Sequence, residues 1–139
     1  MSESLPIFQY VRRAQGVWGT RVFADGLVEE YSDEEIDFSE AGQLIARAVP
    51  LAWRFRAQLT PAETQRLVNA IRQSLFFTLP VQFTTPPPAL DGATVVWSAA
   101  LDGEQHEVTT RGHAQERHPT LEGLRVLFEE LVADALNRD

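Results

Sequence analysis

The sequence contains no cysteine and no lysine, and it has no long hydrophobic run. Without cysteine there is no disulfide framework, no thiol nucleophile and no thiolate-bound zinc. No apolar segment approaches the roughly 18 residues of a membrane-spanning helix, so we expect no membrane insertion. The first residues also lack the basic and apolar regions of a secretory signal, which predicts a cytoplasmic protein. Every basic residue is arginine, and we interpret this as a composition bias.

Size and composition predict one globular domain over residues 1–139. The chain has a mass of 15.6 kDa, and 44% of its residues are hydrophobic. A domain of this length buries roughly two thirds of the surface of its unfolded chain, so we expect its core to need no metal or disulfide. The isoelectric point near 4.8 argues against nucleic-acid binding, because binding to phosphates requires a positive surface.

Negative charge is concentrated in one stretch of the chain. Eight of the twenty acidic residues lie between Asp25 and Glu40, and no arginine lies between Arg21 and Arg47. Outside this stretch, twelve acidic residues balance the twelve arginines, so the stretch accounts for the whole formal charge of −8. The first acids of the stretch fall in a predicted turn and strand. The group without an expected structural role is Asp33, Glu34, Glu35 and Asp37.

Two Asp-Gly pairs predict β-hairpins, because type I′ turns need positive φ at both central residues. With the pair at 102–103 as the turn, Trp97 faces Val108 and forms an apolar face.

The pair at 25–26 predicts the second hairpin. In this register Arg21 faces Glu30, which is an attractive charge pair. An earlier strand over residues 6–13 completes a three-stranded meander.

A further strand is predicted over residues 51–59, where apolar and polar residues alternate. The side expected to face the core carries Leu51, Trp53, Phe55, Ala57 and Leu59.

Two amphipathic helices are predicted. The first opens at Thr60-Pro61-Ala62-Glu63, a capping box with proline at the first helical position. The second runs from about Pro119 to Asn137. Their expected buried residues are Leu67, Val68, Ile71 and Leu75 in the first helix, and Leu121, Leu124, Leu127, Phe128, Leu131 and Val132 in the second. Apolar spacing over residues 40–48 also allows a short helix, although Gly42 disfavours it.

This order of elements predicts an α+β fold. The expected order is β-β-β, then the short helix, then β-α-β-β-α. We therefore expect an antiparallel sheet of about five to six strands with both amphipathic helices packed on one face.

The chain resembles small bacterial proteins of the emfourin type, a family that includes inhibitors of protealysin-like metalloproteases. The resemblance rests on the strand-Gly-strand start VRRAQGVWGTRVF, the Asp-Gly hairpin and the helix exit FFTLP at residues 76–80. A hairpin around Trp97 and a final helix introduced by His118-Pro119 complete it. The resemblance implies a protease as partner and inhibition as activity. It assigns no role to an individual residue.

The acidic group is the first candidate for a binding site. Asp33, Glu34, Glu35 and Asp37 could dock a protein partner with a basic surface, but they lack the spacing of a calcium loop. Alternatively they form a solvated loop or edge strand, or are neutralised by arginines such as Arg54 and Arg56 on neighbouring strands. Trp18, between two glycines near a strand end, is a candidate interface anchor.

The histidines give the only candidates for an enzyme. His106, His113 and His118 lie close together with acidic neighbours, but none of their spacings is that of a zinc site on a strand or helix. The sequence also has no Gly-x-Ser-x-Gly motif and no phosphate-binding loop.

We interpret the chain as a non-enzymatic binding or regulatory module that needs no cofactor. Its expected site is Trp18 with Asp33, Glu34, Glu35 and Asp37. One alternative is a small enzyme using His106 and His113 with neighbouring carboxylates. Another is a structural or stress-associated protein without a defined ligand.

Overall fold

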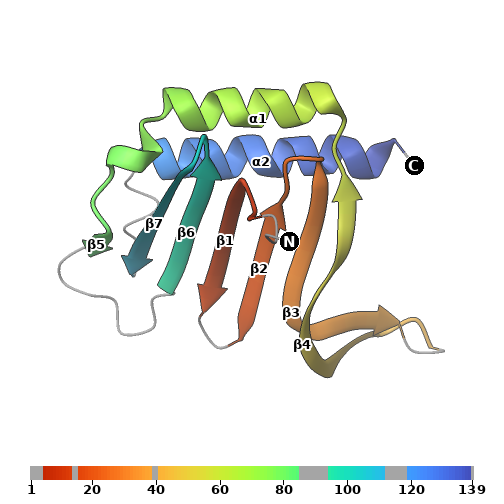
Figure 1. The fold of residues 1–139 in the computed structure, drawn as a ribbon. Helices are drawn as coiled ribbons and strands as arrows, with labels where there is room; N and C mark the ends of the chain where they lie inside the picture. Colours follow the sequence, from red (N-terminus) through yellow and green to blue (C-terminus); the bar gives the residue numbers. More distant parts are fainter. Residues whose placement is uncertain (1–4, 14–15, 39–40, 85–93, 112–118, 139) are drawn as a thin grey trace.

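The computed structural model describes residues 5–13, 16–38, 41–84, 94–111 and 119–138. Within them the chain forms one sheet and two α-helices (Figure 1). The strands are β1 (Phe8–Arg13), β2 (Val17–Val22), β3 (Leu27–Phe38), β4 (Leu44–Gln58), β5 (Gln82–Thr84), β6 (Thr94–Leu101) and β7 (Glu104–Arg111). The helices are α1 (Pro61–Gln73), a 3₁₀ turn η1 (Phe76–Thr78) and α2 (Pro119–Asn137).

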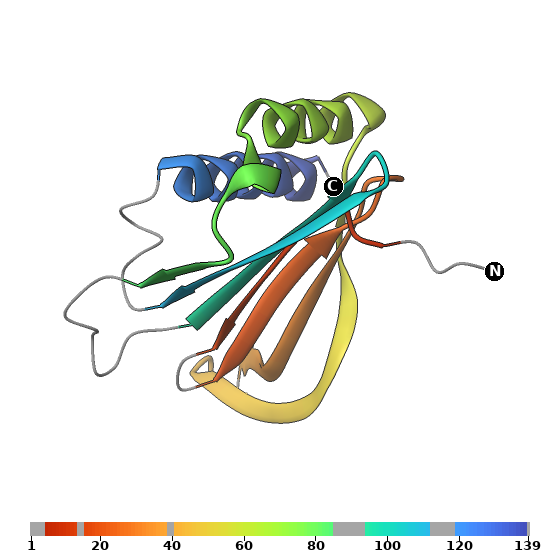
Figure 2. The same ribbon diagram turned by 60° about the vertical axis from the view of Figure 1, so that its left-hand side comes forward.

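The predicted α+β class is confirmed. The strand order is β4-β3-β2-β1-β6-β7-β5, and every neighbouring pair is antiparallel except the short β5, which runs parallel to β7. Strand β5 was not predicted. The two helices lie side by side over one end of the sheet and leave its other end uncovered (Figures 1 and 2).

The short helix allowed over residues 40–48 does not form. Residues 44–48 instead begin β4, where Leu44 pairs with Phe38 and Ala48 with Glu34. Gly42 adopts a φ of +80°, which belongs to a turn between two strands rather than to a helix. A short apolar run fits either structure by its spacing, and the backbone bonds of the neighbouring strand decided between them.

The hairpin at 102–103 has the predicted register, with Trp97 opposite Val108 and positive φ at both turn residues. The hairpin at 25–26 differs by one residue. Arg21 lies opposite Glu29 instead of Glu30, and Val22 opposite Val28, because Phe23 donates its N–H to the Leu27 carbonyl and accepts the N–H of Gly26.

A β-bulge in β4 changes which side chains face the core. Val28 pairs with Ala57 but Glu29 pairs with Phe55, so Arg56 is an extra residue on β4. Ala57 and Leu59 are buried as predicted. Beyond the bulge the alternation is reversed, and Phe55 is 68% exposed while Trp53 is only half-buried. The prediction that Leu51, Trp53 and Phe55 face the core is therefore wrong.

The core lies between the sheet and the helices. Trp97, Phe8 and Phe128 are completely buried and belong to one cluster with the apolar faces of α1 and α2. The predicted capping box is present, since Thr60 accepts the Glu63 N–H and Glu63 accepts the Thr60 N–H. Of the predicted helical residues, Leu75 is the exception, because it lies beyond the end of α1 and is 65% exposed.

Leu75 provides a test of backbone strain. Its φ of 60° is left-handed, a conformation that costs a non-glycine residue about 1–2 kcal/mol. Glycine relieves this cost but loses about 0.5–1 kcal/mol of chain entropy, so we expect Leu75→Gly to raise the free energy of unfolding by about 0.5–1 kcal/mol. Urea titration measures the change. Leu75→Ala, which keeps the strain, should bring no gain; an equal gain would mean that exposure of the side chain is the cause.

Candidate functional site

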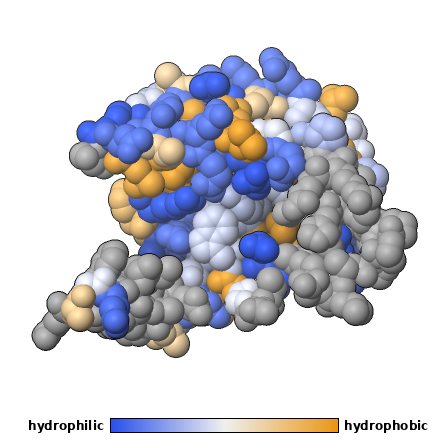
Figure 3. Space-filling model, turned by 180° about the vertical axis from the view of Figure 1, so that it is seen from behind, coloured by the Kyte–Doolittle hydropathy of each residue, from blue (hydrophilic) through white to orange (hydrophobic). Residues whose placement is uncertain are grey.

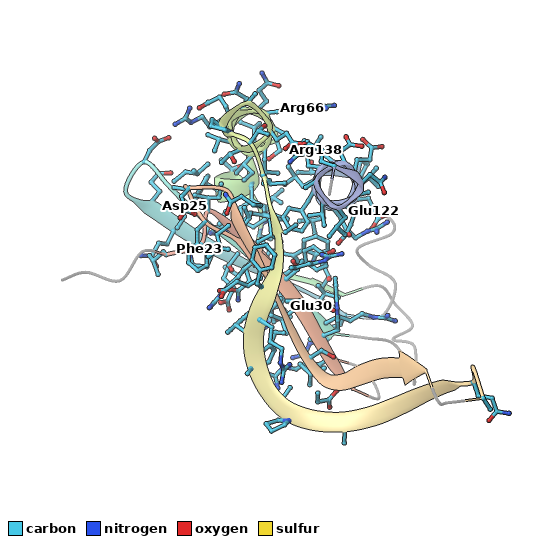
Figure 4. All side chains as sticks on the ribbon, turned by 90° about the vertical axis from the view of Figure 1, so that its right-hand side faces the viewer. Phe23, Asp25, Glu30, Arg66, Glu122 and Arg138 are labelled. Atoms are coloured by element: carbon cyan, nitrogen blue, oxygen red, sulfur yellow. The ribbon has the colours of Figure 1, made fainter. Side chains whose placement is uncertain are left out.

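The acids from Glu29 to Asp37 lie on β3, in the hairpin that this strand forms with β4. Strand β2 pairs with β3 only as far as Ser32, whereas β3 and β4 remain paired from Glu34 with Ala48 to Phe38 with Leu44. Residues 33–38 and 44–50 therefore extend beyond the sheet, and we call them the β3–β4 arm. Figures 1 and 4 show the arm curving away from the other strands. All four predicted acidic residues, Asp33, Glu34, Glu35 and Asp37, belong to it.

Among the described residues, Arg54 and Arg56 are bonded to groups outside the arm's acids. Arg54 donates to the carbonyl oxygens of Pro50 (2.7 Å) and Ser32 (3.4 Å). Arg56 points to the other side and forms an ion pair with Glu129 at 3.0 Å. In the pairing of the arm's backbone, Arg47 lies opposite Glu35. The arm thus brings four acids and one arginine together.

The acids that precede the arm have partners in the sheet. Glu29 forms an ion pair with Arg21 at 2.7 Å, and Glu30 accepts a hydrogen bond of 2.7 Å from the Trp18 indole. Successive residues of a strand point to opposite faces, so these two carboxylates lie on opposite sides of the sheet. Glu29 and Glu30 are therefore structural, as the sequence analysis expected.

Aromatic side chains gather on the sheet face that the helices leave open, directly before the arm. Tyr31 stacks on Trp53 with ring centroids 4.9 Å apart, and the Arg21 guanidinium lies 4.0 Å from the Trp53 ring centroid. We call this group the aromatic patch; it consists of Phe23, Tyr31, Leu51, Trp53 and Phe55. Leu51 and Phe55 are 48% and 68% exposed. Exposed apolar side chains that gather on one face are typical of protein-binding sites.

Trp18 lies on the opposite, helix-covered face. Its ring contacts Tyr10 at 5.6 Å and the Arg56 guanidinium at 5.5 Å, and the side chain is half-buried. Figure 4 shows the separation of the two faces through two labelled residues, with Phe23 on one side of the sheet and Glu30, the partner of Trp18, on the other. Trp18 and the aromatic patch therefore belong to different surfaces.

His106 has a structural environment. Its Nε2 lies 2.7 Å from the Leu79 carbonyl oxygen, and its ring packs edge-on against Phe76. His113 and His118 lie outside the described residues. Within the described ranges, no group of three His, Asp or Glu side chains is placed to hold a metal ion.

A pocket opens on the helix-covered face, where the helical layer ends. Its volume is about 710 Å³, within the range of roughly 300–1,000 Å³ typical of small-molecule sites. The strands contribute Tyr10, Arg12, Trp18, Arg56, Val95 and Trp97, and α2 contributes Glu122, Arg125 and Glu129. Figure 3, which views this side of the molecule, shows a surface hollowed beneath the helices and surrounded largely by hydrophilic residues.

Most charges that line the pocket are paired. Glu129 accepts a short hydrogen bond from the Tyr10 hydroxyl and forms an ion pair with Arg56. Burial, reinforced by the Glu129 hydrogen bond, raises the pKa of Tyr10 well above 10.0. Glu122 forms two hydrogen bonds of 3.0 Å with Arg125, and these raise the pKa of Arg125. Arg12 is exposed and has no hydrogen-bond or ion-pair partner among the described residues.

The sequence analysis did not predict this pocket. Its lining residues are spread over β1, β2, β4, β6 and α2, and no two share a recognisable motif.

Among the described helices, none is both long and apolar enough to cross a membrane.

Comparison with known proteins assigns no family. No protein-family model matches the sequence, and no match was found among proteins of curated function.

Proposed function

We propose that the protein is a binding module that docks a protein partner with a basic surface through the β3–β4 arm and the adjacent aromatic patch. The observation that carries this proposal is the projection of the acidic group beyond the sheet, on segments of β3 and β4 that pair only with each other. Among the described residues, Arg54 and Arg56 bond to the Pro50 carbonyl oxygen and to Glu129, and the backbone of the arm carries four acids against one arginine. The exposed Phe55 and Leu51 supply apolar contact beside it.

Charge and apolar surface have different tasks in such an interface. The acids would attract a basic partner and set its orientation, whereas buried aromatic residues contribute most of the affinity. The emfourin resemblance suggests a metalloprotease as the partner, with inhibition as the result. No observation on the described residues favours an enzyme built on His106, because its Nε2 bonds to the Leu79 backbone carbonyl and His106 is not among the residues that line the pocket.

The arm is tested by removing its charges. In the arm-neutral variant Asp33→Asn, Glu34→Gln, Glu35→Gln and Asp37→Asn are combined. We expect its partner to bind at least about tenfold more weakly, because four favourable charge contacts are lost. Affinity capture followed by titration of the captured protein measures the effect. Wild-type binding should also weaken as salt rises through a few hundred millimolar, since exposed charges are then screened.

A matched control removes the same number of charges elsewhere. Glu104→Gln, Glu107→Gln, Glu130→Gln and Asp134→Asn change exposed carboxylates on β7 and α2 and give the same net charge as the arm-neutral variant. This control should bind like the wild type. Equal loss in both variants, or binding that salt does not weaken, would contradict docking through the arm. Assay of a thermolysin-like metalloprotease with the same three proteins tests the inhibitor hypothesis.

A further inference from the structure

We propose that the pocket on the helix-covered face binds a small organic carboxylate with a flat, apolar body, and that Arg12 holds its carboxylate group. This site is separate from the arm and the aromatic patch, because Trp18 and Arg12 project from the other face of the sheet. The proposal does not depend on a protein partner.

The charge of the pocket selects an anion. Its lining contains three arginines and two glutamates. Each glutamate is already bonded to one arginine, Glu129 to Arg56 and Glu122 to Arg125. The guanidinium of Arg12 remains, without a partner among the described residues and at the edge of a concave surface. An unpaired guanidinium in such a place attracts an anionic group of a ligand.

The charges of the pocket lining also favour a carboxylate over a phosphate. A guanidinium offers a planar fork of N–H donors that matches the two oxygens of a carboxylate. A phosphate monoester carries nearly two negative charges, and one free arginine would neutralise only part of them. Because Arg56 and Arg125 are held by their own carboxylates, a second free cation is absent from the described lining of the pocket.

The aromatic lining selects the body of the ligand. Arg12 lies directly opposite Trp18 on the neighbouring strand and opposite Val95 on the other side. A carboxylate on Arg12 would place the attached group over these side chains. The Trp18 indole is fixed by its hydrogen bond to Glu30 and by contact with Tyr10, so its face is presented without loss of side-chain freedom on binding. Flat apolar groups stack well on such a surface.

Binding can be followed through the three tryptophans. Trp18 and Trp97 both line the pocket, but Trp97 is completely buried and its indole N–H is bonded to Thr110, so the partly exposed Trp18 is the more direct reporter; Trp53 reports on the aromatic patch. We would titrate the ¹⁵N-labelled protein with 2-naphthoate and assign the signal with Trp18→Phe. We expect a saturable shift of the Trp18 signal with a dissociation constant on the order of 1 mM or lower, and no shift of Trp53. The neutral isostere 2-naphthamide should bind about tenfold more weakly or not at all.

Two neighbouring arginines give a matched pair of variants. Arg12→Gln should weaken 2-naphthoate binding about tenfold or more, because a charge-assisted hydrogen bond is lost. Arg13→Gln removes the next guanidinium, which is also exposed but faces the other side of the sheet, and should have no effect.

Several results would overturn the proposal. They are an absent or unsaturable Trp18 shift, equal binding of naphthoate and naphthamide, or equal affinities of the two arginine variants. A shift of Trp53 instead of Trp18 would place the ligand on the aromatic patch. Tighter binding of 2-naphthyl phosphate than of 2-naphthoate would reject the carboxylate assignment. Urea titration of both variants, with equal midpoints expected, shows that neither change acts through folding.

Discussion

Gly26→Ala is expected to lower the free energy of unfolding by about 3 kcal/mol, whereas Gly103→Ala is expected to cost only about 1 kcal/mol. Both glycines follow an aspartate in a hairpin turn, and their φ angles are nearly equal, +88° and +81°. The backbone cost of alanine in this conformation is therefore the same in both, about 1–2 kcal/mol, less the chain entropy that alanine saves in the unfolded state. The difference between the losses of unfolding free energy in the two variants therefore measures the effect of the atoms that surround each glycine.

The surroundings of Gly26 leave no space for a methyl group. A Cβ there would lie 2.5 Å from the Leu59 carbonyl oxygen and 2.9 Å from the Thr64 hydroxyl oxygen, whereas nothing lies within 4 Å of a Cβ on Gly103. Leu59 also donates its N–H to the Gly26 carbonyl at 2.9 Å. A shift that relieves the clash would stretch this bond, which joins the start of β3 to the entry of α1. We attribute about 2 kcal/mol to this contact.

Both variants are measured by urea titration, and we expect the unfolding free energy to depend on urea concentration with the same slope in each. A lower midpoint with an unchanged slope reports stability alone. If both variants lose the same amount, the backbone around Leu59 relaxes freely and the close approach has no energetic weight. A loss at Gly103 as large as that expected at Gly26 would instead mean that the turn conformation dominates.

The sequence predicts the local elements well where one local rule decides them. The capping box at Thr60 and the hairpin at 102–103 each depend on residues close in sequence, and both are present as predicted. The faces of β4 could not be predicted, because the reversal at Arg56 depends on how β3 pairs with it. Nothing in the alternating residues 51–59 marks the extra residue.

The candidate sites show the same limit. The acidic group was visible as a local excess of charge, but its projection beyond the sheet follows from the unequal lengths of β2 and β4. Trp18 was predicted as a surface anchor because two glycines flank it. Its place in the pocket follows from contacts with Tyr10, Arg56 and Glu30, which lie on three other strands.

The second large effect is expected at Glu129, which joins the helix α2 to two strands. Its carboxylate accepts from the Tyr10 hydroxyl on β1 and from Arg56 on β4. Glu129→Gln keeps the size of the side chain but leaves the Arg56 guanidinium, whose side chain is only 18% exposed, without a counter-ion. Because the pair is partly open to solvent, we expect a loss of about 2 kcal/mol, below the 3–5 kcal/mol of a fully buried pair.

Glu122→Gln is the matched control on the same helix. Glu122 also forms an ion pair, but with Arg125 three residues later in α2, and the arginine side chain is 37% exposed. Pairs of this kind contribute about 0.2–0.5 kcal/mol. We therefore expect a loss of at most about 0.5 kcal/mol, measured by the same urea titration. Equal losses at positions 122 and 129 would contradict a special role for the cluster around Tyr10.

Tyr10→Phe completes the test through its pH dependence. The pKa of Tyr10 is raised in the folded protein, chiefly by burial and then by the Glu129 hydrogen bond. The hydroxyl therefore stays protonated at pH values at which it ionises in the unfolded chain. The unfolded state therefore binds fewer protons above pH 10, and stability should fall as the pH rises through and beyond that value. In Tyr10→Phe this alkaline loss should be smaller, although the variant starts about 1 kcal/mol less stable at neutral pH. Identical alkaline slopes in both proteins would show that Tyr10 does not carry the effect.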